Sequence, residues 1–485
     1  MAATEVELLA QLTALKSQLE KRARRVKLLD QYVGDETCPL PDAIVRARIT
    51  KTYRMLMGLS DAPFGSLVVG AVTDRLIPTG ITSSQNSRAE LDALWGDVWQ
   101  DNRMDGESLL AHNAALTHGR AFAIIWPGRD GKPKIALNSA EQVVVQYAEG
   151  SRTERVCAGR FWVDDAGRKY ANLYRPDGIY KFIQPRSRLT GLAGGQRGEW
   201  ERRDVAGETW PLANPWGIVP VVELPVNRKL KPGSYPYARG EFEHCIGLLD
   251  RINLLTFLGL VVAFWMGFPL RAVIGDKILR DDDDNPLPPF EAAADAVAQF
   301  EDPGTRLATF EAADRKLLSI YSELDQLSSL TATPRYYLPM EGGMSNISAE
   351  TIWATDGALV AKMPTHKGSL GEGWEETLRV AGLMLPQPVE LSPRAELSWS
   401  DHEHRSLAER ADAASKLKDV MPWQLLAEKV LNLTADEISR GESAMSSTGL
   451  GQLVASLTTP TPPGAQPPAL ALAPPPAPTP APVAG

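Results

Sequence analysis

The stretch Glu241–Met266, EFEHCIGLLDRINLLTFLGLVVAFWM, decides how this chain is built. Its second half is almost entirely apolar, whereas its first half also carries Glu243, Asp250, Arg251 and Asn253. The stretch predicts one helix, about 39 Å long at a rise of 1.5 Å per residue. A helix that is apolar on every side must be covered on every side, so we expect its second half to be buried between neighbouring elements.

The apolar run within this helix, Leu254–Phe268, is 15 residues long and is followed by Pro269 and Arg271. A membrane-spanning helix needs about 20 residues, so the run favours a buried helix in a large assembly. A membrane-associated protein remains the alternative. Residues Met1–Ala10 lack the basic and apolar regions of a secretory signal, so we expect no secretion.

The length, the cysteines and the net charge of the chain indicate its number of domains, its compartment and its class of function. A chain of 485 residues is too long for one compact core, which predicts two or more domains. Cys38, Cys157 and Cys245 are far apart and odd in number, which fits a reducing compartment. The net charge of −9 argues against a protein that grips DNA by its phosphates. It does not argue against a channel, because an acidic wall lets DNA slide past.

The N-terminal half predicts helices followed by strands. Thr4 and Glu7 form a capping box before a helix with leucines on one face. Further helices are expected at 66–76, 87–99 and 107–118, the last ending at Gly119. The apolar period then changes to two, which predicts strands at 121–126, 142–147, 156–163, 170–174 and 179–183. The fold class is therefore α+β, with an antiparallel sheet.

The C-terminal half predicts mainly helices. One helix is expected over 312–330, with Leu317, Tyr321, Leu324 and Leu327 on one face. Two prolines and a glycine pair interrupt it at 333–344, and helix resumes near Ser348. Pro364 and three following glycines are expected to kink or interrupt that helix. The tail 458–485 has 11 prolines in 28 residues, so we expect it to be disordered.

No motif for catalysis or metal binding is found. The six histidines lack zinc-binding spacing, and neither a nucleophile elbow nor a phosphate loop is present. We therefore expect no catalytic residue, cofactor or metal, with a packaging nuclease or ATPase as the enzymatic alternative. Whether Asp281–Asp284 binds a cation is left open, although a solvated loop is the simpler interpretation.

Several short strings occur together in one order along the chain. They are 32–34 (YVG), 67–76 (LVVGAVTDRL), 217–222 (GIVPVV), 249–253 (LDRIN) and 399–401 (WSD), followed by Arg405-Ser406, Ala411–Ala413 and Lys416-Leu417. In this order they resemble the portal proteins of tailed phages, particularly siphoviruses that infect actinobacteria. The resemblance covers about Gln11 to Arg440 and leaves out the proline-rich tail.

The resemblance implies a portal fold with an α/β wing, a helical stem, a small α/β clip and a helical crown. Its parts would be the wing (1–240), stem helices (241–266 and 312–334), clip (267–311), tunnel loop (335–347), long kinked helix with wing return (348–399), crown (400–442) and disordered tail (443–485). About twelve subunits would form a ring at one capsid vertex.

The implied function is a channel for genome packaging and ejection. Its expected partners are double-stranded DNA, passed without sequence specificity, terminase, a head-tail adaptor, and the major capsid and scaffolding proteins; no membrane is expected. The chain would be found in the virion, and in the host cytoplasm during assembly.

The resemblance also implies two sets of site residues. The tunnel loop facing DNA would comprise Arg335, Tyr336, Tyr337, Met340, Glu341, Gly342, Gly343, Met344, Ser345 and Asn346. The stem residues would be Asp250, Arg251, Asn253, Leu317, Tyr321 and Leu324. Two adjacent glycines allow the loop backbone to move, and its tyrosines and methionines offer contacts that do not read base edges.

Overall fold

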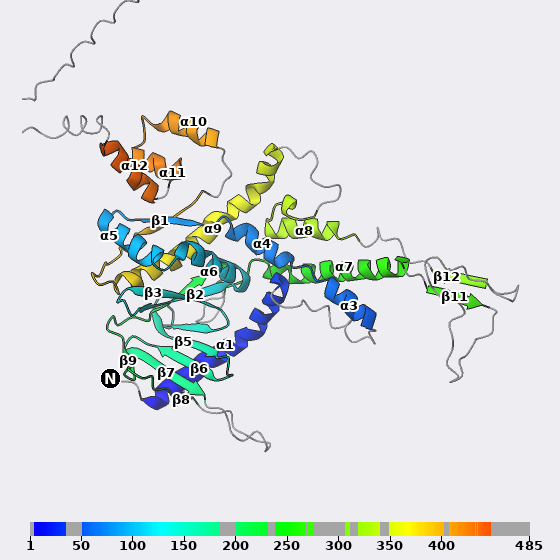
Figure 1. Ribbon diagram of the computed structural model, residues 1–485, viewed down its shortest axis with the longest axis horizontal. Coiled ribbons are helices and arrows are strands. Elements are labelled where there is room, and N and C mark those ends of the chain that lie inside the picture. Colours follow the sequence, from blue (N-terminus) through cyan, green and yellow to red (C-terminus); the bar gives the residue numbers. More distant parts are fainter. Residues whose placement is uncertain are drawn as a thin grey trace, which may run out of the picture. The chain divides into compact units, whose positions relative to one another are not determined.

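The computed structural model describes residues 4–34, 51–184, 200–230, 238–267, 270–274, 306–310, 319–339, 349–401, 407–431, 433 and 435–447 (Figure 1). The chain divides into two compact units, Met1–His404 and Arg405–Gly485. The first unit holds all strands of the described residues, and the described part of the second is helical. The α+β class predicted from the sequence is confirmed.

Two antiparallel sheets are stacked in the first unit. The larger sheet has the order β4-β5-β6-β7-β8, with β9 also paired to β7. Its strands are β4 (Val143–Tyr147), β5 (Arg155–Val163), β6 (Lys169–Tyr174), β7 (Gly178–Gln184), β8 (Glu201–Arg202) and β9 (Leu212–Ala213). The smaller sheet has the order β10-β2-β3, formed by β2 (Arg120–Pro127), β3 (Pro133–Ser139) and β10 (Val221–Pro225).

Successive side chains of each strand point to opposite faces, and one face of the smaller sheet packs against one face of the larger sheet. Phe122 and Ile124 of β2 pack with Val143, Ala158 and other residues of the larger sheet. The opposite face of the larger sheet is covered by α1 (Glu5–Val33), whose leucines at 8, 12, 15 and 19 are buried there. Thr4 and Glu7 form the predicted capping box, and Gly34 adopts a left-handed conformation at the C-cap.

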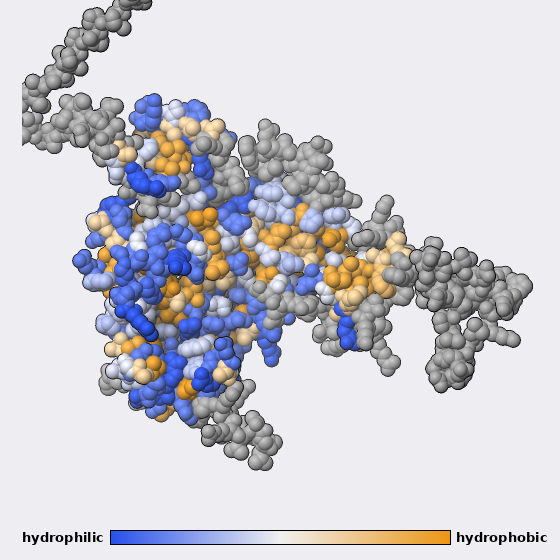
Figure 2. Space-filling view, in the orientation of Figure 1, coloured by the Kyte–Doolittle hydropathy of each residue, from blue (hydrophilic) through white to orange (hydrophobic). Residues whose placement is uncertain are grey.

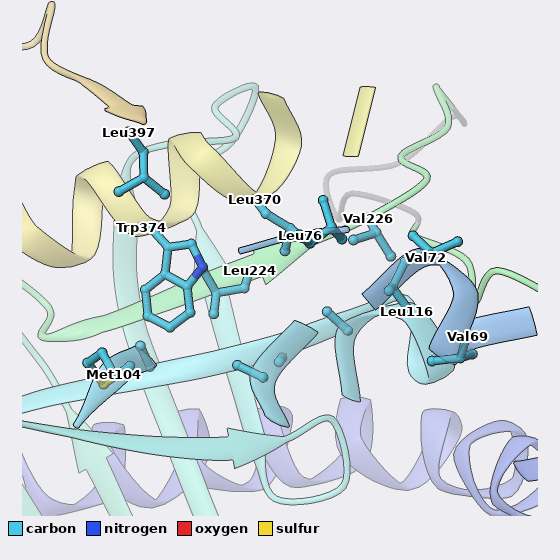
Figure 3. Close-up of a cluster of buried hydrophobic side chains, with 14 of the residues drawn as sticks. Val69, Val72, Leu76, Met104, Leu116, Leu224, Val226, Leu370, Trp374 and Leu397 are labelled. Carbon is cyan, nitrogen blue, oxygen red and sulfur yellow. The ribbon is translucent and has the colours of Figure 1, made fainter. Parts of the chain in front are cut away.

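Helices cover the other face of the smaller sheet and form the main core. They are α4 (Phe64–Thr73), α5 (Arg88–Ala93), the π-helix η1 (Leu94–Gln100), α6 (Met104–His118) and α9 (Ala349–Gly382). Figure 3 shows Trp374 of α9 beside Leu224 of β10, with Met104 of α6 nearby. A C-terminal strand, β13 (Glu396–Trp399), returns to pair with β1 (Pro78–Thr82).

The helix α9 runs through Pro364 and the three glycines without interruption. Of the two expected outcomes, the interruption is therefore wrong, and a kink stays a prediction. Gly373 has a packing role instead: a Cβ there would lie 2.5 Å from Leu224 Cδ2 and 3.1 Å from the Glu223 carbonyl. The glycine therefore lets α9 lie directly on β10.

The stretch Glu241–Met266, predicted to form one helix, is helical from Glu243. A single 3-10 turn, η2 (Glu243–Cys245), leads into α7 (Ile246–Gly267). Two helices contact it, α3 (Lys51–Leu59) and α8 (Tyr321–Thr331), and the 3-10 turn η4 (Arg335–Tyr337) contacts α8. Beyond α7, β11 (Leu270–Ile274) pairs with β12 (Arg306–Phe310) in an antiparallel hairpin.

The helix predicted over 312–330 begins later than expected. Ser319 and Ile320 are not helical, and α8 starts at Tyr321. The Ser319 hydroxyl accepts a hydrogen bond from the Tyr321 backbone N–H at 3.4 Å, a local contact that competes with helix formation. Leu317 and the remainder of that prediction lie outside the described residues.

The second unit contains α10 (Leu407–Leu417), α11 (Trp423–Lys429) and α12 (Ala435–Ser447). The C-terminal half was predicted to be mainly helical, and these helices agree with that prediction. The Asp281–Asp284 run and the proline-rich tail lie outside the described residues.

Candidate functional site

The first half of α7 is fixed to α1 by charged side chains. Arg25 donates through Nε to Glu243 Oε1 at 2.7 Å and through Nη2 to Oε2 at 2.5 Å. The Tyr32 hydroxyl donates to Asp250 Oδ1 at 2.5 Å. Leu249 is buried beside these contacts. The base of α7 therefore has a defined position on the sheet-bearing part of the unit.

The second half of α7 is covered far less. Its Phe257 is buried in a small cluster that α3 completes, mainly through Leu56. Leu258 is 36% exposed and Met266 is 59% exposed, and α3 adds Leu59 at 63%. Figure 2 shows the resulting apolar surface around the outer part of α7 and α3. Large apolar groups at this density mark a surface that another protein or a membrane covers.

Two segments are long and apolar enough to cross a membrane by length and composition alone, Arg54–Thr73 and Glu243–Phe264. The first is not one helix, because residues 60–63 between α3 and α4 are not helical. The second includes the anchored base of α7, where Glu243 and Asp250 form the contacts to α1. Such a segment is also typical of a core helix in a soluble protein.

The helix α8 lies beside the base of α7. Arg251 Nη2 donates to Gln326 Oε1 at 2.9 Å, and His244 Nε2 lies 3.1 Å from the Leu330 carbonyl. Of the predicted stem residues, Asn253 and Leu324 are buried, and Asp250, Arg251 and Tyr321 are at least partly exposed. The structure thus brings the described members of this set onto two adjacent helices.

A buried ionic network joins the start of this helix pair to α9. Glu241 accepts from Lys362 Nζ at 2.8 Å and from Asn227 Nδ2 at 2.8 Å, and His366 Nε2 lies 3.3 Å away. Lys362 also donates to the carbonyl of Thr331 at the end of α8, at 2.6 Å. Burial would raise the pKa of the Glu241 carboxyl. The hydrogen bond from His366 and the charge of Lys362 outweigh burial and hold that pKa far below its usual range.

The turn after α8 is held by a second buried ion pair. Arg75, at the end of α4, and Asp356, on α9, are 6% and 7% exposed and lie 3.1 Å apart. Tyr336 donates to Asp356 at 2.5 Å, and Tyr337 lies 3.0 Å from Arg75 Nη1. Arg335 forms an ion pair with Asp325 of α8. All three side chains of η4 are therefore bound to neighbouring elements of the same chain.

The other predicted tunnel-loop residues lie outside the described part of the chain: Met340, Glu341, Gly342, Gly343, Met344, Ser345 and Asn346. The DNA-facing role of the loop stays a prediction. What the structure adds is the position of its ends, since η4 forms the first three residues of the loop and α9 begins shortly after its last residue. Asp356 thus ties the turn at the start of the loop to the helix after it.

Sequence reasoning missed the residues that hold these helices in place: Arg75, Asp356, Glu241 and Lys362. Each is one charged residue in an apolar or helical stretch. Because a buried charge needs a partner, a charged residue in a stretch that is expected to be buried indicates an ion pair. One sequence gives no sign of which partner, because Arg75 and Asp356 are 281 positions apart.

The described residues hold no group of three or more His, Cys, Asp or Glu side chains placed to bind a metal ion. His112 accepts a hydrogen bond from Trp374 Nε1 at 2.7 Å, and burial lowers the pKa of this histidine to about 3. Burial raises the pKa of the Cys157 thiol to about 11, which makes it a poor nucleophile. These side chains have the properties of core residues.

Residues 14–444 match the family of phage portal proteins described as SPP1 Gp6-like. The chain belongs to this family. It is 28% identical over 452 residues to the portal protein of Mycobacterium phage D29, covering 87% of each chain. It is 27% identical over 399 residues to the portal protein of Mycobacterium phage L5, covering 78% of this chain and 76% of that one. The predicted resemblance to portal proteins of phages that infect actinobacteria is confirmed.

Solved structures give a weaker comparison. A chain from the neck of an empty GTA particle covers 78% of this portal-family chain and 92% of its own length, with 12% identity and a TM-score of 0.42. A chain from a native GTA virion gives the same TM-score at 13% identity. A score at this level does not establish a shared fold.

Proposed function

We propose that this portal-family chain forms a closed ring of about twelve subunits and that the ring is the DNA channel at one vertex of a capsid. The observation that carries the proposal is the outer half of α7, an apolar helix with an anchored base and a partly exposed apolar surface. A neighbouring copy of the same helix would cover it.

The energetics favour a partner for this surface. Burying one large aliphatic side chain stabilises a protein by about 1.5–3 kcal/mol relative to leaving it exposed. The exposed side chains here include Leu258 and Met266 of α7 and Met55 and Leu59 of α3. When a contact joins two different faces of identical subunits, each added subunit is rotated by the same angle. If a whole number of these rotations completes a full turn, the subunits form a closed ring without open ends.

The charge supports a channel that does not hold DNA tightly. The net charge of −9 per chain repels phosphate, and each additional subunit adds to that repulsion. We assign the contact with DNA to the tunnel loop, 335–347. Within it, Arg335, Tyr336 and Tyr337 hold the base of the loop, because their polar groups already bind Asp325, Arg75 and Asp356. Met340 to Asn346 would face the DNA.

The wider assignment follows the family. Residues 1–240 would form the wing, 241–266 and 312–334 the stem, 267–311 the clip, and 400–442 the crown. Terminase and a head-tail adaptor would dock on the ring, and the major capsid and scaffolding proteins would surround it. The chain would act without a cofactor and without enzymatic activity, in the virion after assembly in the host cytoplasm.

Multi-angle light scattering of the purified chain tests the ring. Twelve copies of 52.8 kDa predict a mass of about 630 kDa. Replacing Leu258 and Met266 by lysine should shift the mass to smaller species, whereas Val163→Lys, at a site also 59% exposed but on β5, should leave the ring intact. A wild-type chain that stays monomeric over a wide concentration range would refute the proposal.

A membrane protein is the competing function, and the apolar segment Glu243–Phe264 favours it. The two proposals differ in how the chain behaves without detergent. A ring should stay in the aqueous phase in detergent partition at low salt, whereas a membrane protein should enter the detergent phase.

A further inference from the structure

A pair of arginines converges on two stacked aromatic rings at one end of the larger sheet. Trp162 of β5 and Tyr170 of β6 are cross-strand neighbours, with ring centroids 5.4 Å apart and planes at 21°. Arg160 Cζ lies 5.1 Å from the Trp162 centroid. Arg203 Cζ lies 5.6 Å from Trp162 and 4.9 Å from Tyr170. Arg168 Cζ also lies 5.9 Å from the Tyr170 centroid, but Arg168 pairs with Asp164, which accepts a hydrogen bond from the Tyr170 hydroxyl at 3.2 Å. Three cations therefore stand over one aromatic surface, and one of them has a carboxylate partner.

Arg160 and Arg203 differ from their neighbours in having no carboxylate partner within the described part of the chain. Close by, Arg168 pairs with Asp164, Arg202 with Asp204, and Lys181 with Glu208. The polar contact of Arg160 is with the hydroxyl of Tyr174. The Nε atoms of Arg160 and Arg203 are both buried and make no hydrogen bond to any described residue.

Such an arrangement costs stability in the isolated chain. Like charges that converge repel each other, and a buried donor without an acceptor loses its hydration. Stacking on Trp162 and Tyr170 offsets part of this cost by cation–π attraction. It also fixes the guanidinium planes, so that their N–H groups are preorganised for an oxyanion.

We propose that Arg160 and Arg203, held on Trp162 and Tyr170, form a docking site for a carboxylate side chain of a partner protein. Arginine binds carboxylates with two parallel hydrogen bonds, and Trp, Tyr and Arg are the residues enriched at binding hot spots. The partner segment would carry an Asp or Glu next to an apolar side chain, which would contact the aromatic pair. The site is independent of ring formation and of the DNA channel.

The surrounding charges favour a protein over a nucleic acid. Asp164, Glu201, Asp204 and Glu208 lie on the strands and turns that flank the site, and the whole chain carries a net charge of −9. Duplex DNA carries a charge about every 1.7 Å, so its neighbouring phosphates would meet these carboxylates. A single carboxylate on a peptide would not.

Fluorescence anisotropy of the full-length protein with a labelled peptide that carries a single glutamate between leucines and has neutral ends tests the proposal. We expect saturable binding that weakens about tenfold or more in the double variant Arg160→Gln with Arg203→Gln. Arg202→Gln is the matched control: Arg202 also stacks on a ring, Trp210 at 4.7 Å, but already pairs with Asp204. It should bind the peptide as the wild type does. A peptide with glutamine in place of glutamate should not bind.

Three results would overturn the proposal: equal binding by the double variant, no saturable peptide binding up to about 1 mM, or displacement of the peptide by a short DNA duplex at lower concentration. Thermal melting of each variant checks folding. If the double variant does not fold, the single variant Arg203→Gln at the end of β8 and the charge-conserving replacement of both arginines by lysine take its place. Lysine keeps the charge but loses the two-pronged geometry, so we expect binding between wild type and double variant.

Discussion

Replacing Asp356 by alanine should destabilise the chain strongly, because it leaves Arg75 buried without its counterion. Both side chains are more than nine-tenths buried, so solvent screens the pair little. Removing one partner of such a pair typically costs about 3–5 kcal/mol. Tyr336 would also lose the acceptor that its hydroxyl contacts at 2.5 Å. We expect a total near the upper end of that range.

Thermal melting at a fixed protein concentration measures the effect, since stability in an oligomer depends on concentration. The matched control is Asp92→Ala, which removes an ion pair with Arg88 at the same distance of 3.1 Å but more than half exposed. An exposed pair of this kind contributes about 0.3–0.5 kcal/mol, so the control should melt close to the wild type.

A double replacement separates a buried charge from general damage to the core. Arg75→Met combined with Asp356→Leu removes both charges, and apolar replacement of a buried pair is often neutral. We therefore expect the double variant to recover most of the stability that Asp356→Ala loses. If Asp356→Ala melts like Asp92→Ala, or if the double variant melts as low as Asp356→Ala, the reasoning from an uncompensated charge is wrong.

Three further predictions concern the helix pair, the tail and the loop. Glu241→Gln should destabilise the chain most near neutral pH. The depressed pKa of Glu241 stabilises the fold above its unfolded value, about 4.5, and this contribution fades as the pH falls below it, so melting curves of both chains should converge in acid. Truncation after Gly449 should leave the number of subunits in the ring, obtained from the scattering mass, unchanged, because the tail lacks apolar periodicity and charge; a truncated chain that stays monomeric would show that the tail is structural. Deleting Gly342–Ser345 should leave rings intact but reduce the length of packaged DNA in complementation of a portal-null phage, and normal yields of full heads would contradict the role assigned to the loop.

The elements with a strong local signal could be predicted from the sequence. The capping box at Thr4 and the terminal glycine Gly119 are both found where the sequence indicates. These features act within one turn of helix, so the residues that decide them are adjacent in the chain. The five predicted strands also form. Successive side chains of a strand point to opposite faces of the sheet, so the pattern that predicts a strand lies in neighbouring residues.

Elements that depend on distant partners could not be predicted in the same way. The short strand β13 exists by pairing with β1, over 300 positions earlier. Gly373 was one of four residues expected to kink or interrupt a helix, yet it is the close approach of β10 that explains a glycine there. For the candidate site, the sequence indicated the helix α7 and the turn after α8, and it missed Arg75 and Glu241, whose partners on α9 become visible only in the fold.

The ionic contacts and the apolar surface of α7 have a physical connection. Arg25, Tyr32 and the Glu241 network fix the base of the helix pair, so its direction is set by several directional contacts. Beyond Asn253 the side chains of α7 are apolar except for Thr256, whose hydroxyl donates to the Ile252 carbonyl of the same helix at 2.8 Å. Hydrophobic burial carries little directional information. In the proposed ring, an assembly that buried this outer half would therefore take its geometry from the base. The ionic contacts would decide where each α7 points, and the apolar surface would supply the free energy that holds neighbouring copies together.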